Sequence, residues 1–124
     1  MRYGDPGGVQ PVPEQALPPA EALALAQSLL DGGRAFGAHE VLEAVWKAAP
    51  AGERELWQGL AQLCVAITHG QRGNRGGAAT LVRRGSARLR PYAARPPHGI
   101  DVPGLLAWSE RWDGDPTEPP RLRR

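Results

Sequence analysis

The amino-acid sequence predicts an all-α protein, a single compact bundle of four to five antiparallel helices with extended, proline-rich termini. Two observations favour helices. Apolar residues recur with helical spacing through most of residues 20–112, and no stretch shows the apolar-polar alternation of a strand. The short connections between the expected helices favour antiparallel neighbours. We therefore expect a helical domain over residues 20–112, an extended arm over 1–19 and a proline- and arginine-rich tail over 113–124.

Length and composition limit the class of protein. A chain of 124 residues, 41% hydrophobic and 23% charged, fits one globular domain. No apolar run approaches the roughly 18 residues that a membrane span needs, so we expect no membrane partner. The first residues lack the apolar core of a signal peptide and Cys64 is the one cysteine, so we expect a cytoplasmic protein. A net charge of +2 predicts no general affinity for nucleic acid.

The first two helices are expected over residues 20–30 and 34–49. Five prolines within residues 1–19 forbid a continuous helix before them. The first helix is rich in Ala and Leu and ends at Asp-Gly-Gly, residues 31–33, where a glycine can adopt the left-handed conformation of a helix cap. The second helix ends at Pro50.

The third helix is expected over residues 53–71 and should be the central one. It has no charged residue between Glu55 and Arg72, so other helices must enclose most of its surface. One side carries small residues that would let a neighbouring helix approach closely. These residues are Gly59, Ala66 and Gly70.

Two further helices complete the expected bundle. Asn74 is a plausible N-cap for a fourth helix that runs to about residue 94, with arginines on its outer side. Asp101 has the same role for a short fifth helix, whose Trp108 and Trp112 can cover the bundle. If either tryptophan were exposed, it would favour a homodimer through an apolar patch.

Residues 36–46 of the second helix, Phe-Gly-Ala-His-Glu-Val-Leu-Glu-Ala-Val-Trp, are the strongest candidate for a functional site. They place a histidine and two carboxylates inside an apolar helical pattern, which is costly unless these groups are satisfied. We expect Glu40 and Lys47 to turn away from the face that carries the others. That face is expected to hold Phe36, His39, Glu43 and Trp46.

A buried polar cluster follows from folding the second helix back on the third. That register makes Gln62 the nearest polar partner of His39, with His69 at the margin. His39, Glu43 and Gln62 thus predict a small-ligand or structural site. In a purely structural arrangement, Glu43 pairs with Lys47 one turn on.

Four sequence blocks in a fixed order characterise the domain. They are Phe36-x-x-His39-Glu40-x-x-Glu43-x-x-Trp46, Gly59-Leu60-x-Gln62-Leu63-x-Val65-Ala66-x-x-His69, Gly73-Asn74-x-x-Gly77-Ala78-x-x-Leu81 and Gly99-Ile100-Asp101-Val102. With these blocks the chain resembles the domain-of-unknown-function 309 family of small bacterial and plant proteins, over roughly residues 20–112. The resemblance implies a helical fold and a site centred on the motif, and it implies no particular reaction.

A metal-dependent enzyme is the alternative function. His39 and Glu43 have the i, i+4 spacing that allows one helix face to bind a divalent metal, with His69 as a third ligand and Glu40 as general base. The zinc-protease helix requires a second histidine where this chain has Glu43, so that motif does not fit.

A weaker alternative is an RNA- or phosphate-binding module. Glycines and arginines gather where the fourth helix begins, and anions are favoured at a helix start. Further arginines follow on its outer side. The candidate residues are Arg72, Arg75, Arg83 and Arg84.

Overall fold

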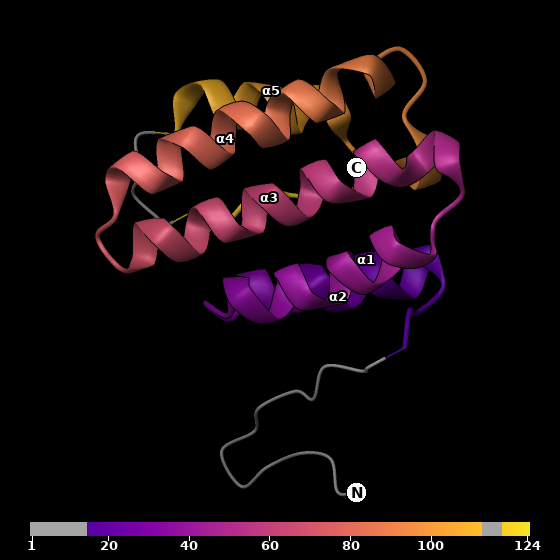
Figure 1. Ribbon diagram of the computed structural model, residues 1–124, viewed down its shortest axis with the longest axis horizontal. Coiled ribbons are helices and arrows are strands. Elements are labelled where there is room, and N and C mark those ends of the chain that lie inside the picture. The colour runs from indigo at the N-terminus through magenta and orange to yellow at the C-terminus, as the bar shows by residue number, and fades with distance from the viewer. Residues whose placement is uncertain (1–14, 113–117) are drawn as a thin grey trace, which may run out of the picture.

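The computed structural model describes residues 15–112 and 118–124. Most of the predicted N-terminal arm, residues 1–14, and the first part of the predicted tail, residues 113–117, lie outside the described residues. Figure 1 shows the helices stacked side by side.

Within the described ranges the protein has five α-helices, three short 3₁₀ turns and no strand beyond one isolated bridge, which confirms the all-α prediction. The bounds of the α-helices lie within one residue of expectation for the first three. They are α1 Pro19–Asp31, α2 Ala35–Ala48, α3 Arg54–Gln71, α4 Arg75–Leu89 and α5 Val102–Arg111; the 3₁₀ turns are η1 Ala51–Glu53, η2 Arg90–Tyr92 and η3 Pro97–Gly99.

Helix α3 is central, as its uncharged sequence predicted. In Figure 1 it crosses the middle of the molecule, with α1 and α2 on one side and α4 and α5 on the other. The apolar stripe of α3 is buried throughout, and its members are Leu56, Leu60, Leu63 and Ile67. No helix in the described part of the chain has the length and apolar character of a membrane span.

Two predicted caps begin helices α4 and α5. The Asn74 side chain accepts a hydrogen bond from the Gly77 amide at 3.0 Å, and Asp101 accepts one from the Gly104 amide at 3.1 Å. Helix α4 ends at Leu89, earlier than the expected residue 94. The reason is Pro91, which has no amide hydrogen to continue the helical ladder.

Helices α3 and α4 touch through their backbones at two glycines. A Cβ placed on Gly59 would lie 2.9 Å from the Gly85 carbonyl oxygen, and a Cβ on Gly85 would lie 2.9 Å from that of Gly59. Gly59 therefore has the role that the small-residue pattern predicted for it, a close approach to another helix.

The tryptophans of the C-terminal helix do not form the exposed patch on which a homodimer was premised. Trp108 is buried and Trp112 is partly buried, and their rings stack with centroids 5.2 Å apart. Trp108 donates its indole hydrogen to the carbonyl oxygen of Glu118 at 3.2 Å. Residues 118–124 of the tail therefore pack against the helical bundle.

Candidate functional site

A cavity of about 360 Å³, which we call the α2 pocket, lies where α2 begins. It is bordered by the α1–α2 turn, the first turns of α2 and the last turn of α3. Its lining residues are Leu29, Gly33, Arg34, Ala35, Phe36, Gly37, Glu40, Thr68, Gln71 and Arg72. The first turn of the sequence motif thus borders a hollow of the surface.

Phe36 is exposed at this pocket. Its exposed fraction is 51%. Within residues 15–112 and 118–124, no other large hydrophobic residue is exposed. The ring also lies beside the His39 ring, with centroids 5.2 Å apart. The motif aromatic is therefore available to solvent rather than buried in the core.

The charges around the pocket are of both signs. Arg34 precedes α2, Arg72 follows α3, and Glu40 lies one turn along α2 from Phe36; all three are exposed and line the same cavity. Arg34 occupies the N-cap position of α2, but its side chain makes no capping bond, and the first turn of α2 carries no acidic residue. The positive end of the helix thus adds to the positive charge of the arginines.

The expected orientation of Glu40 and Lys47 is wrong. At about 100° per residue, Glu40 lies only about 40° and Lys47 about 20° around the helix from Phe36. In the structure Glu40 shares the α2 pocket with Phe36, and the Lys47 ammonium is 3.7 Å from the Glu43 carboxylate.

His39 and Glu43 form a second group along α2. His39 Nε2 lies 3.5 Å from the Glu43 carboxylate, which also receives Lys47 from the other side. His39 Nδ1 is buried without a hydrogen-bond partner. The pair of Glu43 and Lys47 matches the structural arrangement considered above.

Gln62 does not join His39. Its side-chain oxygen accepts a hydrogen bond from Arg88 Nε at 3.0 Å, and the same guanidinium binds the Glu55 carboxylate at 2.7 Å. Arg88 belongs to α4, so Gln62 serves the contact between α3 and α4. Gln62 is therefore not the partner of His39 that the two-helix register predicted, and Arg88 was not among the residues that the sequence analysis considered.

His69 has a structural partner in the turn between α3 and α4. Its Nδ1 accepts a hydrogen bond from the Asn74 amide nitrogen at 3.0 Å, while the Asn74 oxygen caps α4. His69 therefore orients the residue that begins α4. Within residues 15–112 and 118–124, no three His, Cys, Asp or Glu side chains lie together as a metal site requires, so the triad His39, Glu43 and His69 is not assembled.

The four candidate phosphate-binding arginines are spread along the surface. Arg72 borders the α2 pocket, Arg75 begins α4, and Arg83 and Arg84 are exposed more than two turns further on. Eight residues of helix span about 12 Å, so these arginines do not converge on one phosphate.

Trp46 and Cys64 belong to the packing of the bundle. Trp46 is partly buried, and the Arg54 guanidinium lies 5.7 Å from its ring centroid. Cys64 is fully enclosed, and burial raises the pKa of its thiol to about 12. A thiol with so high a pKa is a poor nucleophile.

A contact that the sequence did not reveal joins η1 to η3. His98 Nε2 lies 2.8 Å from Glu53 Oε1, and the indole of buried Trp57 donates to the same oxygen at 3.1 Å. The hydrogen bond from His98 is the main cause that holds the pKa of Glu53 below its ordinary value, with burial acting in the opposite direction. The partners are 45 residues apart in sequence, so no local pattern signals the contact.

Fold and site define a small all-α domain with a surface pocket at the first turn of its motif helix. Residues 23–81, just under half of the chain, match the family described as "Domain of unknown function (DUF309)". This match supports the resemblance carried by the first three sequence blocks; the fourth block lies beyond the matched residues. No curated protein and no solved structure matches the chain.

Proposed function

We propose that this domain binds a small organic ligand in the α2 pocket. The observation that carries the proposal is Phe36, which stays 51% exposed beside a cavity of about 360 Å³ instead of entering the core. Leaving about half of a phenylalanine in water forfeits roughly 0.8–1.5 kcal/mol of burial free energy, half of the value for full burial, which a bound ligand would recover. Ligand sites typically combine such an apolar wall with a few charged groups.

The chemistry of the pocket favours a ligand with an apolar part and an anionic group. The Phe36 ring offers a face for the apolar part, and the guanidinium groups of Arg34 and Arg72 offer bidentate hydrogen bonds to a carboxylate, sulfonate or phosphate. Glu40 can accept a hydrogen bond from a donor on the same ligand. His39 and Glu43 then support the helix that presents Phe36, in place of the buried cluster with Gln62.

A cytoplasmic location is part of this proposal, and a homodimer is not. A free, buried Cys64 thiol is typical of a reducing compartment and supports the cytoplasm. The buried Trp108 removes the premise on which a homodimer was expected.

The fluorescent probe 1-anilinonaphthalene-8-sulfonate tests the pocket, because it joins an aromatic body to a sulfonate. We expect the full chain to bind it, and Phe36→Ala and Arg34→Ala each to weaken binding by about tenfold, which equals about 1.4 kcal/mol. Arg84→Ala is the matched control, since Arg84 is exposed on α4 outside the cavity. Titrations followed by fluorescence give the dissociation constants. Equal binding by wild type and both pocket variants would reject the α2 pocket as the site.

A further inference from the structure

Residues 118–124, which we call the C-terminal segment, bind the bundle as an extended peptide would. Hydrogen bonds fall on alternate residues. The carbonyl oxygens of Glu118, Pro120 and Leu122 accept from the Trp108 indole, the Gln27 side chain and the Asp101 amide, at 3.2, 3.0 and 2.9 Å. This period of two is the pattern by which a binding site reads the backbone of an extended chain.

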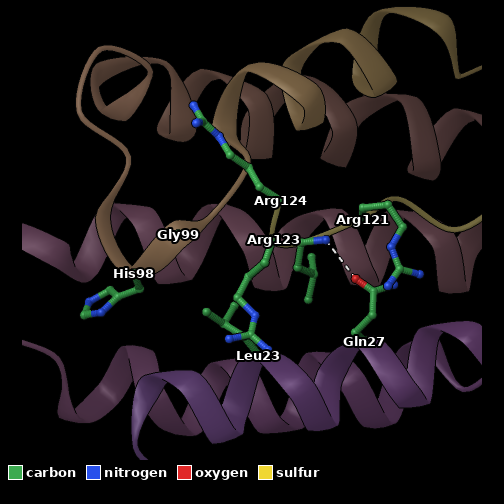
Figure 2. A pocket seen from close by; sticks show the side chains of 8 residues that line it. Leu23, Gln27, His98, Gly99, Arg121, Arg123 and Arg124 are labelled. Carbon is green, nitrogen blue, oxygen red and sulfur yellow. Dashed lines mark hydrogen bonds between the residues drawn. The ribbon is translucent and has the colours of Figure 1, made fainter.

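Gln27 of α1 recognises two backbone groups of the segment with one side chain. Its oxygen accepts from the Leu122 amide at 2.8 Å, and its nitrogen donates to the Pro120 carbonyl at 3.0 Å. Figure 2 shows the Gln27 carboxamide directed at the backbone of the C-terminal segment between Arg121 and Arg123, where a dashed line marks the hydrogen bond. On the other side of the segment, the Arg124 amide donates to the Gly99 carbonyl at 3.2 Å. A helix side chain and a loop thus hold the segment between them.

Two side chains of the segment supply the remaining contacts. Leu122 is 1% exposed and belongs to the apolar core that also includes Leu23 and Ile100. Arg121 pairs with Asp31 at the end of α1, with its guanidinium 3.2 Å from the carboxylate. The bundle therefore selects a leucine anchor preceded by a basic residue, and its other contacts are to the backbone.

The side chains that follow the anchor are largely free. Arg123 and Arg124 are exposed and border a second cavity of about 360 Å³ beside α1. His98 and Gly99 line the same cavity. In Figure 2 these two arginines point in different directions, away from each other. They do not converge as an anion site would require, so the recognition resides in Leu122, Arg121 and the backbone.

We propose that this surface is a docking site for an extended peptide of a partner protein in which a basic residue precedes leucine, and that the C-terminal segment occupies it in competition. The docking surface consists of Gln27, Asp31, Gly99, Asp101 and Trp108. An intramolecular occupant has an effective concentration in the millimolar range, so a partner peptide binds the wild-type chain weakly until the segment is displaced. The arrangement makes the C-terminal segment an autoinhibitor of the docking surface.

The test uses the full chain carrying Leu122→Asp, which removes the anchor and releases the segment. The probe is a fluorescein-labelled peptide with the sequence of residues 118–124, Glu-Pro-Pro-Arg-Leu-Arg-Arg. We expect fluorescence anisotropy to show at least about tenfold tighter binding of this peptide to Leu122→Asp than to wild type. Adding Gln27→Ala to the variant should reverse most of that gain, because it removes two hydrogen bonds to the peptide backbone.

Two controls separate docking from charge attraction. A peptide with serine in place of the leucine keeps every charge and should not bind. Arg123→Ala in the full chain should leave the segment docked and match wild type, because Arg123 is exposed. Circular dichroism checks that each variant is folded.

A milder variant keeps the proposal testable if Leu122→Asp does not fold. Arg121→Glu reverses the charge that faces Asp31 and loosens the segment without exposing the core. It should bind the peptide more tightly than wild type does. Absence of peptide binding to the folded variants at millimolar peptide, or equal binding of the leucine and serine peptides, overturns the proposal.

Discussion

Glu43 and Glu40 lie about one turn apart on α2 and have different surroundings. Glu43 lies within 3.5 Å of His39 and 3.7 Å of Lys47, whereas Glu40 is exposed at the pocket. Glu43→Ala should lower the free energy of unfolding by about 0.5–1 kcal/mol, since each i, i+4 pair contributes about 0.3–0.5 kcal/mol. Glu40→Ala should change it by less than about 0.5 kcal/mol. Urea denaturation of both variants gives the two values.

The salt dependence shows whether charge pairs or packing cause the larger loss of stability expected for Glu43→Ala. Ions screen exposed charge pairs, so the difference between the two variants should shrink in about 1 M salt. A larger loss for Glu40→Ala, or a Glu43 effect that salt does not reduce, would contradict the assignment of roles along α2.

The motif helix could be predicted from sequence, but the partners of its polar residues could not. The spacing of His39 and Glu43 on one helix is a local property, and the structure pairs them. Gln62 could face either neighbour of the central helix, and an alignment of two helices alone omits α4. Arg88 of α4 supplies a charged donor, which makes the stronger hydrogen bond.

At the scale of elements, the contact of α3 and α4 rests on Gly59 and Gly85. Gly85→Ala places a Cβ 2.9 Å from a backbone oxygen and 3.0 Å from Leu63. Such overpacking costs about 1–3 kcal/mol, more than the gain of up to about 1 kcal/mol in helix propensity. We therefore expect a lower midpoint of thermal unfolding, measured by circular dichroism.

Gly76→Ala is the matched control in the same helix. A Cβ at Gly76 meets nothing within 4 Å, so this variant should equal or exceed the stability of wild type. Equal stability of the two variants would mean that α4 can move away from α3 at little cost.

The helix starts could be predicted from sequence because caps act locally. The packing of the tail against the bundle could not. Asn74 and Asp101 bind amides three residues ahead of them, so their role is visible in a short stretch of sequence. Leu122 lies in a proline- and arginine-rich stretch that has the composition of a solvated tail. Its side chain joins the core of the bundle, and its amide binds Gln27, 95 residues away in sequence.

At the scale of the whole molecule, a few side chains join segments that are distant in sequence. Gln27 ties α1 to the C-terminal segment, and Glu53 ties η1 to η3 through His98. Tyr92 adds a third link, because its hydroxyl donates to the Gly52 carbonyl at 2.7 Å. Two of these links meet at η1, the connection between α2 and α3.

The Glu53 link makes the stability of the whole bundle dependent on pH. Its pKa in the folded protein is lowered from the ordinary 4.5, mainly by the hydrogen bond from His98. A carboxylate whose pKa is lowered by folding stabilises the fold when the pH is above its pKa in the unfolded chain. This contribution is lost as the pH falls through its pKa in the folded protein. Glu53→Gln should therefore be less stable than wild type at about pH 6, and the difference should narrow as the pH falls below about 4.5.

His98→Asn tests the cause of this pH dependence. Asparagine tolerates the left-handed backbone of residue 98, φ 58°, so the variant removes the imidazole without straining the turn. Because the bond from His98 is the largest cause of the lowered Glu53 pKa, His98→Asn should show most of the Glu53→Gln loss at about pH 6. Chemical denaturation between about pH 3 and pH 7 gives the three profiles. Parallel profiles for wild type and Glu53→Gln would show that Glu53 titrates alike in the folded and unfolded chains, and the link between η1 and η3 would then contribute nothing through its charge.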